Sequence, residues 1–160
     1  MIRCFLAFCL GLLVIEGVAG DEKADELKKF QGHWRIIQAQ RGADEITKHI
    51  LNIEFNGTTK ITENALCGPL EKNKFSIDAT KKPRQIDEHA FATKILVDPK
   101  KGKIESVFPI TFRGIYEFHG NRLRICITID PNGDRPTEFR ATKENKGTKE
   151  TLLLVLEKRK

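Results

Sequence analysis

Apolar and polar residues alternate most clearly between residues 110 and 129, on both sides of the Gly120-Asn121 pair. A period of two is typical of a β-strand with one buried face. Glycine at the first position of a two-residue loop suits a type II′ turn. We therefore predict a β-hairpin in which Phe118 lies opposite Leu123. On the same face, Tyr116 would lie opposite Ile125 and Phe112 opposite Ile129.

A second hairpin is predicted over residues 50–63, where apolar and polar residues alternate up to Asn56-Gly57. A two-residue turn at that pair would place Ile53 opposite Lys60, which is a poor match. A three-residue loop that includes Thr58 places Ile53 opposite Ile61 instead. We prefer the longer loop because its cross-strand pairs are more favourable.

The remaining pattern predicts short elements. Residues 21–31 have a helix pattern that ends at Gly32, and residues 43–50 suit one or two helical turns. Further strands are expected at 33–40, 73–78, 85–91, 104–108, 137–141 and 151–158. The last is apolar on both faces, which favours a central strand or a covering helix. The pattern predicts an all-β fold, an antiparallel up-and-down barrel of about eight strands or a sandwich.

The first 20 residues have the pattern of a secretory signal peptide. Arg3 precedes an apolar run from Cys4 to Ile15, and small residues follow it. Cleavage is expected near Ala19 or Gly20, which would leave residues 21–160 as a single domain. The protein is then expected to be exported to the periplasm or the extracellular space. No later segment has the length and hydropathy of a membrane span.

The cysteines that follow the predicted signal peptide are Cys67 and Cys126. An exported chain can form a disulfide between them, although lone cysteines also serve as small core residues. The alternation places Cys126 on the polar face of its strand, beside Arg124. Such a position would favour the thiolate, and in an exported protein a bridge or an inert thiol is the simpler interpretation.

The net charge of +6 raises the question of a polyanionic partner. Basic and acidic residues are interleaved, as in 143–150, so a solvated surface explains the charge better. We expect no nucleic-acid partner, because the aromatic residues lie in the apolar phase of the strands. An envelope polyanion remains an alternative partner for Lys100, Lys101 and Lys103.

The sequence contains no recognisable catalytic constellation. Its four histidines are not paired at metal-ligand spacing, and no serine lies in a glycine elbow. The acidic residues at 130–134 lack the glycine and acid positions of an EF-hand calcium loop, so a plain turn is expected. We therefore predict no enzymatic activity, no cofactor and no metal.

Five blocks of sequence resemble, in order, a family of small exported domains that is abundant in planctomycete bacteria. They are KKFQGHWRIIQAQRG, IEFNG, KKPRQID, GIYEFHGNRLRIC and DRPTEF, and the resemblance as a whole extends from about residue 27 to residue 156. The family is described as lipocalin-like, within the calycin type, and has no established ligand or reaction. The resemblance implies a lipocalin-like barrel.

The Gly-His-Trp motif at 32–34 is similar to the Gly-x-Trp that begins the first strand of lipocalins. The resemblance implies that Trp34 packs across the closed end of the barrel and that Gly32 lets the chain turn beneath it. It also implies a late arginine stacked on the indole, with Arg140 and Arg159 as candidates.

A barrel of this size can hold one small ligand inside, and an apolar one would suit its residues. The alternative is an extracytoplasmic interaction or scaffold domain whose barrel is filled and holds no ligand. A monomer is expected in either case. The residues expected to line the barrel interior are Trp34, Ile36, Ile53, Phe55, Phe75, Phe112, Tyr116, Ile125 and Phe139.

Overall fold

The computed structural model describes residues 18–64, 70–98, 102–143 and 150–160. The chain begins with helix α1 (Val18–Phe30) and strand β1 (Gly32–Arg41). The elements that follow are β2 (Asp44–Glu45), the 3₁₀ helix η1 (Thr47–His49), β3 (Ile50–Asn56), β4 (Thr59–Asn64), β5 (Glu71–Asp78), β6 (Arg84–Asp98), β7 (Gly102–His119), β8 (Arg122–Thr128) and β9 (Thr151–Lys158).

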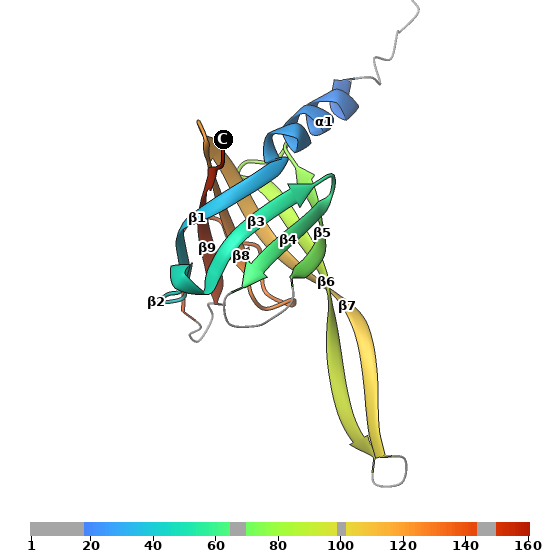
Figure 1. Cartoon of the computed structure of the whole chain (residues 1–160). Helices are drawn as coiled ribbons and strands as arrows, with labels where there is room; N and C mark the ends of the chain where they lie inside the picture. Colours follow the sequence, from blue (N-terminus) through green and yellow to red (C-terminus); the bar gives the residue numbers. More distant parts are fainter. Residues whose placement is uncertain (1–17, 65–69, 99–101, 144–149) are drawn as a thin grey trace, which may run out of the picture.

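The strands form a closed antiparallel barrel (Figure 1). The sheet order is β2-β1-β3-β4-β5-β6-β7-β8-β9, and β1 also pairs with β9. The sheet has nine strands. The two-residue β2 pairs with β1 at the end of the strand order, so the other eight strands form the barrel. The predicted all-β barrel of about eight strands with a short N-terminal helix is therefore confirmed.

The hairpin predicted around Gly120-Asn121 is confirmed. Phe118 pairs with Leu123 and Tyr116 with Ile125, and Gly120 has the positive φ of 59° that a type II′ turn needs at its first position. The ladder ends before Phe112 would reach Ile129. Strand β9 lies between β8 and β1. Leu154 and Leu156 face the barrel core and Leu153 belongs to a second apolar cluster on the outside, which explains why the sequence of β9 is apolar on both faces.

The register predicted for the second hairpin is wrong. The turn consists of Gly57 and Thr58, so Phe55 pairs with Lys60 and Ile53 with Thr62. The φ of Gly57 is 57°, a conformation that favours glycine at the first position of a two-residue loop. Because the loop begins at Gly57 and not at Asn56, the strand pairing differs by one residue from the predicted register. A shift of one residue exchanges the faces of β4. Lys60 and Thr62 thus point into the barrel.

Two other predicted elements differ from the structure. The helix expected after the first strand is only the short η1, preceded by β2. Residues 137–141 are not a strand but part of an irregular segment (129–142) that lies against the outside of the barrel. Arg135 anchors this segment because its guanidinium donates to the carbonyl oxygens of Gly114 (2.6 Å) and Ile86 (3.2 Å).

Beneath this outer segment is a small second cluster of apolar side chains. Ile115, Cys126 and Leu153 are buried there, and Phe139 and Ala141 pack against them. Phe139 was predicted to line the barrel interior, and that placement is wrong. Strands β7, β8 and β9 carry apolar residues on their outer faces, and Phe139 covers that outer surface.

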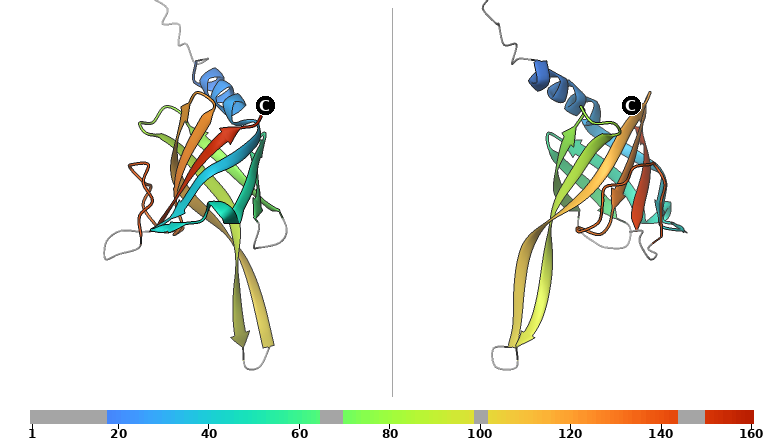
Figure 2. Two further views of the ribbon diagram at one scale, coloured as in Figure 1. Left: turned by 60° about the vertical axis from the view of Figure 1, so that its left-hand side comes forward. Right: turned by 180° about the vertical axis from the view of Figure 1, so that it is seen from behind.

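The two longest strands extend well beyond the barrel. β6 pairs with β5 only from Gln85 to His89, and β7 pairs with β8 only from Gly114 onward, whereas β6 and β7 pair with each other up to Asp98 and Gly102. The outer part, residues 90–98 and 102–110, projects as a two-stranded arm from the end of the barrel away from α1 (Figures 1 and 2). We refer to this part as the arm.

Candidate functional site

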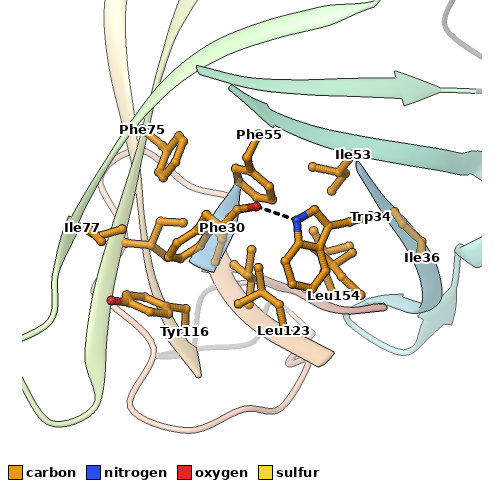
Figure 3. Packing of buried hydrophobic residues seen from close by; sticks show 14 of the residues in the cluster. Phe30, Trp34, Ile36, Ile53, Phe55, Phe75, Ile77, Tyr116, Leu123 and Leu154 are labelled. Atoms are coloured by element: carbon orange, nitrogen blue, oxygen red, sulfur yellow. Dashed lines mark hydrogen bonds between the residues drawn. The ribbon is translucent and has the colours of Figure 1, made fainter. Parts of the chain in front are cut away.

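One end of the barrel is closed by the end of α1 (Figures 1 and 3). Phe30, the last residue of the helix, is fully buried, and its ring contacts the rings of Phe55, Tyr116 and Phe118 with centroids 4.9–5.3 Å apart. Trp34 is 1 % exposed, and its indole Nε1 donates a 2.6 Å hydrogen bond to the Phe30 carbonyl oxygen. The indole thus lies at the closed end, and Phe30 shares the closure.

The cation over the indole is Lys158 rather than an arginine. Its Nζ lies 5.4 Å from the centroid of the Trp34 ring. Both candidate arginines make other contacts: Arg159 donates to the side-chain oxygen of Asn52, and Arg140 pairs with Glu138 at 2.8 Å. Trp34 pairs with Lys158 in the β1–β9 ladder, and this register brings the lysine to the ring.

A carboxylate on α1 attaches the helix to the barrel wall. Glu26 is 3 % exposed, and its two oxygens pair with Lys29 (2.6 Å) and with Arg84 of β6 (2.8 Å). Burial first, and then the charge of Glu26, raises the pKa of the Tyr116 phenol above its ordinary value. The phenol is therefore neutral at physiological pH, and Tyr116 belongs to the buried apolar core at this end of the barrel.

The other end of the barrel contains a cavity of about 230 Å³. Its place follows from the strand registers, because Leu152 pairs with Arg41 at the end of β1 that is distant from Trp34. The cavity is open to solvent. It is lined by Ile50, Ile53, Lys60, Thr62, Glu71, Asn73, Glu88, Phe112, Ile127, Thr128, Ile129, Leu152 and Leu154.

Three polar side chains form part of the inner wall of this cavity. The Nζ of Lys60 donates to Oε2 of Glu88, and the Nδ2 of Asn73 donates to Oε1 of Glu88 at 2.7 Å. The side chains of Lys60 and Glu88 are each 9 % exposed. Isolated buried charges are very unfavourable, and their pairing, together with the amide of Asn73, offsets the desolvation. We refer to Lys60, Asn73 and Glu88 as the polar triad.

The polar triad can recognise a polar group on a bound molecule. An ammonium group has three N–H bonds and a carboxylate has about four lone-pair sites, so Lys60 and Glu88 retain hydrogen-bonding capacity beyond their mutual contact. The rest of the lining is mostly aliphatic and aromatic. Within the residues that the structure describes, no group of three or more His, Cys, Asp or Glu residues is arranged to hold a metal ion.

The structure divides the predicted lining residues into three groups. Ile53 and Phe112 line the cavity. Phe139 lies outside the barrel. The remaining six point inward but belong to the packed core: Trp34, Ile36, Phe55, Phe75, Tyr116 and Ile125. The interior is therefore filled near α1 and hollow at the opposite end.

None of the three residues of the polar triad was predicted from the sequence. A signal was available, because Asn73 shares a strand phase with Phe75, and Glu88 shares one with Ile86. A charged residue in the apolar phase of a strand has to find a buried partner. The wrong register of the second hairpin placed Lys60 on the outer face and so concealed that partner.

Cys126 is a free, buried thiol whose Sγ donates to the carbonyl oxygen of Arg140 at 3.5 Å. The 129–142 segment covers the outer face of this strand, which explains why Cys126 is buried although the alternation placed it on the polar face. Burial raises the pKa of the Cys126 thiol, so the reactive thiolate is disfavoured. Cys67 lies outside the described residues, and the structure has Cys126 as a free thiol rather than as half of the predicted disulfide.

Cys126 is expected to resist iodoacetamide at pH 8 in the folded protein and to be alkylated fully in denaturant without reductant. Burial disfavours the thiolate form of Cys126 and also prevents the reagent from reaching the sulfur. Mass spectrometry of the peptide that contains Cys126 measures the two extents. Fast labelling of the folded protein would contradict the covered position, and resistance in denaturant until a reductant is added would show a disulfide instead.

Comparison of the chain with protein-family models, with curated proteins and with solved structures finds no match in any of the three. The resemblance to exported planctomycete domains therefore stays a prediction. Among the described residues, none of the helices has the length and hydropathy needed to cross a membrane. Of the lysines considered for a polyanion, Lys100 and Lys101 lie outside the described residues.

Proposed function

We propose that the open end of the barrel binds one small, mostly apolar molecule whose polar group reaches the polar triad. The observation that carries this proposal is an open, largely apolar cavity with a buried ion pair in its wall. Ligand sites commonly combine an apolar lining with a few convergent polar groups. On the signal-peptide pattern, we place this binding role outside the cytoplasm.

The cavity volume limits the size of the ligand. The cavity volume is about 230 Å³. This is below the roughly 300–1,000 Å³ of sites that enclose drug-sized ligands. The occupant is therefore a small molecule, or one end of a longer molecule whose remainder passes through the open mouth.

Binding can be tested with a naphthalene-type dye whose fluorescence rises in apolar surroundings. Leu152 is half-buried and lines the cavity. Leu152→Trp fills the cavity with a larger side chain and is expected to weaken dye binding at least tenfold. Fluorescence titration of the wild type and the variant measures both dissociation constants.

Val155→Trp is the matched control, because Val155 is half-buried on the same strand but in the outward phase. It is expected to bind dye as the wild type does. Equal binding by all three proteins would place the dye elsewhere and contradict the proposal, as would an absence of binding by the wild type. Thermal unfolding of each variant verifies that it is folded.

A further inference from the structure

The arm exposes large apolar side chains. Phe91 is 77 % exposed, Val107 is 66 % exposed and Phe108 is 42 % exposed. Phe91 pairs with Pro109, and Thr93 with Val107, so Phe91, Val107 and Pro109 share one face. Exposed apolar clusters of this kind mark interaction sites.

The arm also has unpaired edges. Within the described residues, β6 beyond His89 and β7 before Gly114 pair only with each other. An isolated two-stranded ribbon is marginally stable in water, and its free N–H and C=O groups are a template for another strand. The arm therefore suits a partner that supplies strands to its edge.

A lipid bilayer does not meet this need. Open sheet edges are not tolerated in the hydrocarbon region, because their backbone polar groups find no partners there. A protein strand satisfies those groups. The two edges differ in what they offer: β7 contains Pro109, which has no N–H, whereas residues 90–98 of β6 contain no proline. The β6 edge is the better template.

The sequence of the β6 edge complements itself. Residues 94–98 read Lys-Ile-Leu-Val-Asp, with a positive residue at one end, a negative residue at the other and three apolar residues between them. Two antiparallel copies of this segment centred on Leu96 place Lys94 opposite Asp98 at both ends. Opposite charges across a strand pair stabilise it, and like charges destabilise it.

We propose that the arm joins two copies of this chain by antiparallel pairing of their β6 edges, with Leu96 on the two-fold axis. The result is a four-stranded sheet between two barrels. Such an interface is isologous, so it closes at the dimer. This proposal replaces the expectation of a monomer and does not depend on the ligand proposed above.

The test uses charge reversal and sedimentation velocity over a range of protein concentrations. The wild type is expected to form a dimer. Lys94→Asp places two aspartates opposite each other at both ends of the paired segment, and Asp98→Lys places two lysines there. Each variant alone is therefore expected to raise the dimer dissociation constant about tenfold or more.

An equimolar mixture of the two variants is the decisive measurement. In the mixed dimer, the aspartate introduced in one variant faces the lysine introduced in the other, and the native Asp98 and Lys94 face each other at the opposite end. Dimerisation is expected to return to the wild-type level, which a folding defect would not allow. Leu70→Ser removes the exposed apolar Leu70 outside the arm and is expected to leave the dimer unchanged.

Three results would overturn the proposal. They are a wild type that stays monomeric at all concentrations, a dimer that both charge reversals leave intact, and a mixture that dissociates as its components do. Binding of monomeric protein to anionic phosphatidylglycerol vesicles, without dimer formation, would assign the arm to a membrane surface instead.

Discussion

Replacing Lys60 with methionine is expected to lower the free energy of unfolding by about 3–5 kcal/mol. The variant leaves the Glu88 carboxylate buried, with its side chain 9 % exposed and only Asn73 as a hydrogen-bond donor. An uncompensated buried charge is far less favourable than the intact pair. Urea unfolding followed by circular dichroism measures the loss.

The double variant Lys60→Met with Glu88→Gln separates charge from packing. It removes both charges and keeps an amide oxygen for Asn73, so its stability is expected to lie within about 1 kcal/mol of the wild type. Lys28→Met is the control, because the Lys28–Asp25 pair is largely exposed, at 75 % and 69 %. It should change stability by less than about 1 kcal/mol. Wild-type stability in Lys60→Met would refute the buried pair.

Replacing Phe30 with alanine is expected to lower the free energy of unfolding by about 3–5 kcal/mol. Phe30 is fully buried and its ring packs against those of Phe55, Tyr116 and Phe118. The loss leaves a cavity beneath α1. Trp34 is the single tryptophan of the chain, so its emission reports on this end of the barrel and should shift to longer wavelength as water enters.

Phe91→Ala is the matched control for Phe30→Ala. It makes the same change in the arm, where the side chain is 77 % exposed. Surface substitutions of this kind usually change stability by less than about 0.5 kcal/mol, and the Trp34 emission should not move. Equal effects of the two substitutions, or none from Phe30→Ala, would mean that α1 does not close the barrel.

The candidate site was only partly predictable. Ile53 and Phe112 follow from the alternating pattern and do line the cavity. The polar triad does not follow from it, because the position of Lys60 depends on a one-residue difference in turn length. A local rule that favours apolar cross-strand pairs selects Ile61 for the interior. The buried partner that makes Lys60 acceptable, Glu88, comes from a strand 28 positions later in the chain.

The sequence alone determined the class of the fold and much of its local register. The period of two residues and the Gly120-Asn121 turn specify a hairpin without reference to other strands, because turn geometry and side-chain alternation are local properties. The apolar pattern on both faces of residues 151–158 indicated a central strand or a covering helix, and the structure has the strand. The closed end at Trp34 was implied only by the resemblance of Gly-His-Trp at 32–34 to the lipocalin motif.

Only the tertiary structure decided where the barrel is filled and where it is hollow. Phe55 and Ile53 share one strand face, yet the first packs under α1 and the second lines the cavity. The tertiary structure also decided that Phe139 lies outside the barrel and that Lys158 lies over the Trp34 indole. It decided as well that the paired strands β6 and β7 extend beyond the barrel as the arm. These outcomes depend on which distant segments meet, and the alternation within a single strand carries no information about those encounters.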